Sequence, residues 1–255
     1  MKLGEYIDLM ATEASFWLLG ARDPGYPLEQ LGDLSLEISD SIRGLAIAVL
    51  LARADTNAFL HNLIRSGNMR ETYLRRCMDA GLLDDYHRGS GRYGPLLDAI
   101  ASGDLGLAQR IVELSPTDWR SGCEYEDDYC YAQIIHRWVL GAWRAAEVTP
   151  LFDRFEAFAG GDSPRIAVCS ALLAQDQRAF DEAFDLLLDA REEEVEAEKA
   201  RGQPEEPAAV AQRLVFVEGL ALLRIAEGRG IRTKLDYPMC PSLARLSMTE
   251  PFPGL

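Results

Sequence analysis

The spacing of apolar residues is helical along almost the whole chain. Between residues 41 and 66 the apolar side chains lie mostly three or four positions apart, as at Ile42, Leu45, Val49, Phe59 and Leu63. The same pattern continues over 69–83, 94–114, 129–146, 164–174, 179–199 and 207–227. Such a period indicates amphipathic α-helices, and no alternating run is long enough to predict a sheet. The sequence therefore predicts an all-α protein.

Three short interruptions divide this pattern into helical hairpins, and each of them ends in an aspartate. They are Ala54-Asp55, Gly103-Asp104 and Ala174-Gln175-Asp176. A glycine can adopt the left-handed conformation that ends a helix, and an aspartate can cap the next helix. We therefore expect antiparallel helix hairpins stacked as an irregular helical bundle or a short α-solenoid. The Pro95–Leu114 hairpin resembles one ankyrin repeat but lacks the repeat period of an array.

The length of 255 residues, 48% of them apolar, is sufficient for one large domain. We expect a single helical domain over 1–255, with exposed loops near 84–93 and 201–207 and an extended tail over 237–255. No apolar run is long enough for a membrane span, and residues 1–8 do not resemble a signal peptide. A cytoplasmic location is therefore expected, and the five scattered cysteines are expected to be reduced.

The charge balance bears on the kind of partner. The chain has 26 basic and 41 acidic residues, a net charge of −15. Binding to nucleic acid needs a basic surface, so a nucleic acid partner is disfavoured. An acidic surface instead favours a basic protein partner and speeds association with it. Solubility is the simpler interpretation of the charge taken alone.

The motifs of common enzyme classes are missing. No GxGxxG follows a predicted strand, and neither a P-loop nor a GxSxG motif occurs. No Glu-x-x-His pair typical of carboxylate metal sites is present, and Asp84-x-x-His87 lies in a glycine-rich loop. We therefore expect no enzymatic activity, no metal and no cofactor. An enzyme with a carboxylate–histidine metal site is an open alternative.

The main candidate for a binding site is an acidic and aromatic segment. Its residues are Glu124, Tyr125, Glu126, Asp127, Asp128 and Tyr129. Acidic residues at a helix start contribute about 0.3–1 kcal/mol each, but four in five positions exceed what capping requires. Tyrosines beside carboxylates suit a protein interface. The predicted site is an acidic tip on a buried helix; the other interpretation is a capped helix with an internal arginine partner.

The run Glu124–Ala132, Glu-Tyr-Glu-Asp-Asp-Tyr-Cys-Tyr-Ala, leads into an aromatic helix. It resembles the central motif of the immunity 49 family of bacterial polymorphic toxin systems. Residues Leu36–Gly44, before an alanine-rich helix, are similar to the N-terminal part of such proteins. The resemblance implies a cytosolic all-α protein that binds and neutralises one cognate toxin, delivered between bacteria by a secretion system.

The function expected from these observations is stoichiometric inhibition of a toxin by a non-enzymatic immunity protein. Its acidic surface would face basic residues of the toxin, and a nuclease is the favoured class of toxin. The alternative is a helical-repeat scaffold or adaptor for a partner that is not a toxin. The sequence leaves open the identity of the toxin, the binding face, the stoichiometry and the oligomeric state.

Overall fold

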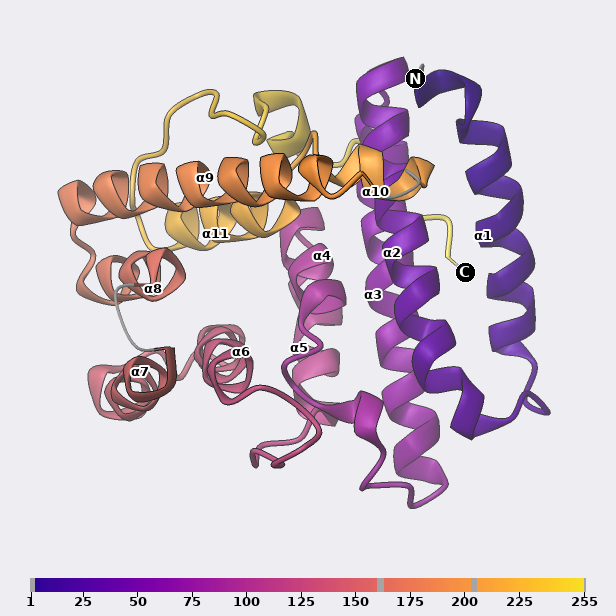
Figure 1. Ribbon diagram of the computed structural model, residues 1–255, viewed down its shortest axis with the longest axis horizontal. Coiled ribbons are helices and arrows are strands. Elements are labelled where there is room, and N and C mark those ends of the chain that lie inside the picture. The colour runs from indigo at the N-terminus through magenta and orange to yellow at the C-terminus, as the bar shows by residue number, and fades with distance from the viewer. Residues whose placement is uncertain (1–2, 160–162, 203–205, 255) are drawn as a thin grey trace.

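The computed structural model describes residues 3–159, 163–202 and 206–254, which form α-helices joined by short loops (Figure 1). The α-helices are α1 (Ile7–Arg22), α2 (Leu28–Arg53), α3 (Thr56–Asp79), α4 (Gly94–Ser102), α5 (Leu105–Leu114), α6 (Glu126–Val139), α7 (Ala145–Ala159), α8 (Pro164–Ala174), α9 (Gln177–Ala200), α10 (Pro207–Gln212) and α11 (Val217–Gly228). Short 3-10 helices are η1 (Leu3–Glu5), η2 (Tyr86–Arg88) and η3 (Ser242–Arg245). The described residues contain no strand, so the all-α prediction is confirmed.

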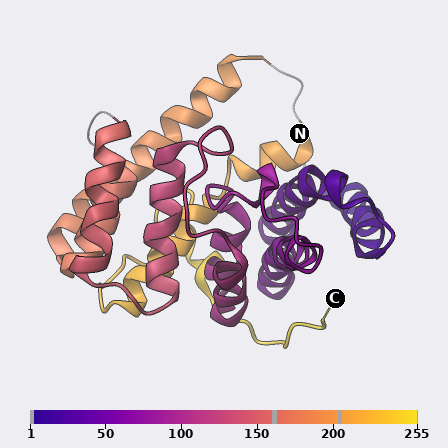
Figure 2. The same cartoon turned by 90° about the horizontal axis from the view of Figure 1, so that it is seen from below.

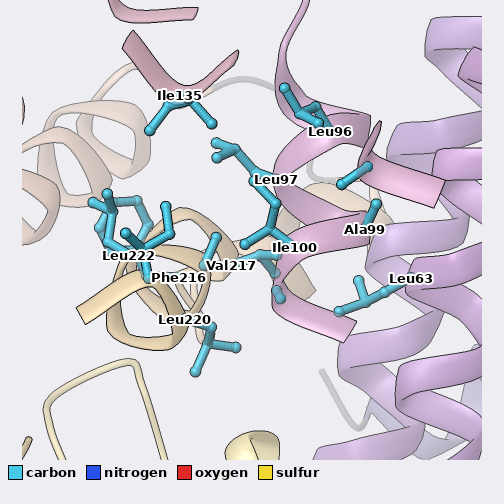
Figure 3. Packing of buried hydrophobic residues seen from close by; sticks show 14 of the residues in the cluster. Leu63, Leu96, Leu97, Ala99, Ile100, Ile135, Phe216, Val217, Leu220 and Leu222 are labelled. Atoms are coloured by element: carbon cyan, nitrogen blue, oxygen red, sulfur yellow. The ribbon is translucent and has the colours of Figure 1, made fainter. Parts of the chain in front are cut away.

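The helices form two groups, with α4 and α5 between them (Figures 1 and 2). Helices α1, α2 and α3 lie on one side, and α6, α7, α8, α9 and α11 lie on the other. Helix α4 packs against both α3 and α11, and every residue from Pro95 to Ser102 is buried. In Figure 3, Leu97 points toward Ile135 of α6 and Ile100 points toward Val217 of α11. Helix α4 is thus buried on all sides, so it is the centre of the core.

The three interruptions that end in an aspartate are helix junctions with the same local structure. The residue that ends the first helix is left-handed in each case: Ala54 (φ 53°), Gly103 (φ 84°) and Gln175 (φ 55°). The side chains of Asp55, Asp104 and Asp176 accept hydrogen bonds from the N–H groups of Ala58, Leu107 and Ala179, at 2.9, 2.9 and 3.0 Å. These bonds satisfy donors that a helix start leaves free. The three predicted breaks are therefore confirmed, and α2–α3, α4–α5 and α8–α9 are packed pairs.

The predicted helix over 129–146 is wrong in its bounds. Helix α6 begins earlier, at Glu126, and ends at Val139, and α7 begins at Ala145. Gly141 adopts a positive φ of 69°, and the N–H of Ala142 donates to the carbonyl of Arg137 at 2.8 Å. This pattern is the usual way in which a glycine after a helix turns the chain away.

A buried carboxylate joins α4 to the first group of helices. Asp98 of α4 accepts hydrogen bonds from Nε and Nη2 of Arg43 on α2, at 2.6 and 2.7 Å, and from the hydroxyl of Ser66 on α3. A Cβ added to Gly44, next to Arg43, would lie 2.6 Å from Cα of Ala208 on α10. Residues 43 and 44 of the Leu36–Gly44 stretch therefore hold helices together.

Of the expected tail over 237–255, residues 249–252 pack along α3. Asn57 accepts a hydrogen bond from the N–H of Thr249 at 2.9 Å, and Nε2 of His61 lies 3.1 Å from the carbonyl of Glu250. The ring of Phe252 meets the His61 ring edge-on at 5.6 Å. Of the expected loop over 201–207, residues 203–205 lie outside the described part. Within that part, no helix combines the length and apolar character needed to cross a membrane.

Candidate functional site

Glu124 is turned toward the glycine-rich loop that precedes α4. Its Oε2 accepts hydrogen bonds from the N–H of Gly91 at 2.5 Å and from the Ser90 hydroxyl at 3.3 Å. A Cβ on Gly89 or on Gly91 would lie 3.1 Å from the same Oε2 atom. The glycines therefore allow the loop to approach the Glu124 carboxylate closely. Exposed backbone N–H groups in such loops can bind an anion, and here a carboxylate of the protein itself takes that place.

The segment 84–93 was expected to be an exposed loop, but its centre is buried. Asp84 and Tyr86 are exposed, whereas Arg88, Gly89 and Ser90 are buried. The guanidinium of Arg70 on α3 donates to the carbonyls of His87, Arg88 and Gly89, at 2.5, 3.0 and 2.8 Å. Buried carbonyl groups need such partners, and the sequence does not reveal that Arg70 supplies them.

Glu126 and Tyr129 take part in contacts inside the protein. The Glu126 side chain is 8% exposed and forms an ion pair with Arg154 of α7. The Arg154 guanidinium lies 5.1 Å from the ring centre of Tyr129 and 5.4 Å from that of Trp119. The Tyr129 hydroxyl donates to the carbonyl of Thr117 at 2.7 Å. These contacts join α6 to α7 and to the loop before α6, so this part of the motif supports the fold.

Asp127 and Asp128 begin the helix side by side but have different surroundings. Asp127 accepts a hydrogen bond from the N–H of Asp128 at 3.0 Å. Asp128 accepts one from the hydroxyl of Tyr93 at 3.2 Å. Burial, and then the charge of Asp127, raise the pKa of Asp128 above its usual range. The charge of Asp128 is therefore poorly solvated.

Tyr125 differs from the rest of the motif because its side chain faces solvent. It is 80% exposed, directly before α6, and it borders a hollow of about 310 Å³. The hollow is lined by Tyr86, Gly91, Arg92, Gly122, Cys123, Glu124, Tyr125 and Asp128. Arg92 donates to the Tyr86 hydroxyl, and its guanidinium lies 4.9 Å from the Tyr86 ring centre.

The structure brings part of the predicted site together and separates the rest. Glu124, Tyr125 and Asp128 line the hollow, whereas Glu126 and Tyr129 contact α7 and the loop before α6. Tyr86 and Arg92 were not among the predicted site residues. The signal that could have found them is the glycine spacing of residues 89–94, Gly-Ser-Gly-Arg-Tyr-Gly, beside two tyrosines.

His87 was considered as a metal ligand and has other partners. Its ring nitrogens lie 3.2 Å from a carboxylate oxygen of Asp85 and 2.7 Å from one of Asp33. In the described part of the chain, no three His, Cys, Asp or Glu side chains are grouped so that they could hold a metal ion.

Residues 41–244 match the family described as Immunity protein 49. The matched range includes all of the helices from α3 to α11 and the motif 124–132. The chain belongs to the Immunity protein 49 family. The resemblance inferred from the motif is thus confirmed. No curated protein and no solved structure matches the chain.

In this member of the Immunity protein 49 family, the motif has an inner and an outer part. The inner part, Glu126 and Tyr129, joins α6 to its neighbours, as the capped-helix interpretation expected. The outer part is Tyr125 with the hollow that it borders, which we call the Tyr125 hollow. An exposed aromatic side chain beside a polar concavity is typical of a surface that another molecule covers.

Proposed function

We propose that this member of the Immunity protein 49 family neutralises a cognate toxin by binding it stoichiometrically, without catalysis. The observation that carries the proposal is the position of Tyr125. It lies in the motif by which the chain resembles the family, it is 80% exposed, and it borders a hollow of about 310 Å³. Exposed tyrosines that a partner buries on binding contribute much of the binding energy of many protein interfaces.

The charge of the protein supports a basic partner. The net charge of −15 attracts a positively charged surface and speeds association with it. A toxin that acts on nucleic acid needs such a surface around its substrate groove. We therefore propose a nuclease as the favoured class of toxin and the cytoplasm as the place of binding.

Affinity capture of the tagged protein from its native cells, followed by mass spectrometry, identifies the partner. We expect one predominant protein that carries a toxin domain. That protein is then expressed in a bacterial host, alone and together with the immunity protein. Growth arrest that is relieved only by coexpression supports neutralisation. Several unrelated housekeeping proteins, or a captured protein without toxicity, would instead favour the alternative of a helical scaffold.

The interface is tested with Tyr125→Ala, and Phe16→Ala serves as the matched control. Phe16 is also an exposed aromatic residue, 68% exposed, but it lies on α1 in the other group of helices. We expect Tyr125→Ala to weaken toxin binding about 30-fold, which corresponds to a hot spot of about 2 kcal/mol. Equal affinity of both variants would place the interface elsewhere while leaving the neutralisation intact.

A further inference from the structure

The carboxylates of the Tyr125 hollow accept their hydrogen bonds from neutral groups. Glu124 accepts from the Gly91 N–H and the Ser90 hydroxyl, and Asp128 accepts from the Tyr93 hydroxyl. By contrast, the neighbouring Glu126 has its own arginine, Arg154. Burial and the charge of Asp127 outweigh the nearby positive charges of Arg165 and Arg92 and raise the pKa of Asp128, so an external cation would still stabilise this carboxylate.

The hollow has one positive lining residue, Arg92, against the two carboxylates of Glu124 and Asp128. Arg92 donates to the Tyr86 hydroxyl and lies over the Tyr86 ring. Tyr86 is 46% exposed and Tyr125 is 80% exposed, so both rings have surface to offer a ligand. Aromatic faces attract cations, and carboxylates form strong hydrogen bonds with a guanidinium. The lining thus combines the two chemistries that recognise an arginine side chain.

We propose that the Tyr125 hollow receives one basic side chain of the cognate toxin, an arginine in preference to a lysine. The identity of the partner rests on the proposed function, whereas the preference of the hollow rests on its lining alone. A volume of about 310 Å³ admits a single extended side chain. A planar guanidinium can reach a carboxylate in a forked geometry and stack on a tyrosine, which a lysine ammonium cannot do.

The shape of the hollow depends on a glycine. A Cβ on Gly91 would lie 3.1 Å from Cβ of Asp128 and 3.1 Å from Oε2 of Glu124. A larger residue at position 91 would crowd the side chains of Glu124 and Asp128. The loop therefore fixes the spacing between the two acidic groups that would meet the cation.

The inference is tested by nuclear magnetic resonance on the full chain labelled with ¹⁵N-glycine and ¹⁵N-tyrosine. The probe is Nα-acetyl-arginine amide, and its uncharged isostere Nα-acetyl-citrulline amide is the matched control. We expect saturable shifts of the Gly91, Gly122 and Tyr125 amides, with a dissociation constant of the order of millimolar. Citrulline should bind at least fivefold more weakly, and Asp128→Asn should weaken arginine binding by a similar factor.

Equal shifts with arginine and citrulline would overturn the inference, as would shifts confined to glycines far along the chain, such as Gly20. Tighter binding of Nα-acetyl-glutamate amide would also overturn it and would identify Arg92 as the anchor for an acidic side chain. The comparison of arginine with citrulline uses the natural protein, so it tests the inference even if Asp128→Asn fails to fold. Because no toxin is present, a negative titration rejects the arginine site and leaves the proposed neutralisation to its own test.

Discussion

Burial keeps one histidine of α6 without charge. His136 is 4% exposed, and this burial, followed by the positive charges of Arg70 and Arg137, lowers its pKa to about 3. In the unfolded chain the pKa of a histidine is about 6.5. The unfolded state therefore binds a proton below pH 6.5 that the folded state does not accept until the pH approaches 3.

This difference predicts a specific loss of stability in mild acid. The contribution of His136 is present above pH 6.5 and falls as the pH decreases, by about 2 kcal/mol between pH 7 and pH 5. Urea denaturation of the natural protein and of His136→Leu at both pH values measures it. The free energy of unfolding of His136→Leu at pH 7 can differ from that of the natural protein. Its decrease between pH 7 and pH 5 should be about 2 kcal/mol smaller than the decrease in the natural protein. Equal losses would show that His136 is already protonated in the folded protein.

At the level of single residues, the sequence showed which positions were unusual but not where their side chains point. Glu126 and Asp128 are two positions apart on a helix and therefore project to different sides. One meets Arg154, 28 residues further along the chain, and the other meets Tyr93, 35 residues earlier. Such distant partners leave no periodic signal, so the inner and outer parts of the motif could not be separated in advance.

At the level of elements, the hairpin junctions were largely predictable. The aspartates were recognised as caps because an Asp before a helical run is a local signal. Gly103 was recognised in the same way, but the left-handed Ala54 and Gln175 were not, since such residues rarely adopt that conformation. The opposite error occurred at 129–146, where the apolar spacing continued across the turn at Gly141.

The left-handed conformation of Ala54 is unfavourable for an alanine, and a glycine at this position would relieve the strain. Ala54→Gly should stabilise the protein by about 0.5–1 kcal/mol, because glycine reaches this conformation without steric cost but loses more chain entropy on folding. Gln175→Gly is the matched comparison. It should gain less, because Nε2 of Gln175 donates to the carbonyl of Arg229 at 2.7 Å. Thermal denaturation of both variants measures the two effects, and a loss of stability in Ala54→Gly would contradict the argument.

On the scale of the whole molecule, the all-helical class followed from periodicity, but the pairing of distant helices did not. Helix α4 packs on α11, and α2 packs on α10, through contacts that join residues more than a hundred positions apart. The close approach of Gly44 to Ala208 is one of them. Apolar faces specify that helices must pack, while the choice among possible neighbours depends on shape and buried charge in three dimensions.

The net charge also acts on the whole molecule, and its effect on binding can be separated from that of the Tyr125 hollow. If the field of the protein steers a basic toxin, the association rate should fall about tenfold or more between low and physiological salt, with little change in dissociation. The exposed acidic residues Glu192 and Glu193 of α9 contribute to this field.

We therefore expect the double variant Glu192→Lys/Glu193→Lys to slow association at low salt and to leave dissociation unchanged. Tyr125→Ala should do the reverse, because a short-range contact acts mainly on the dissociation rate. Surface plasmon resonance with the captured toxin measures both rates at each salt concentration. Faster dissociation of the double variant would mean that α9 touches the toxin directly, and the interface would then extend beyond the hollow.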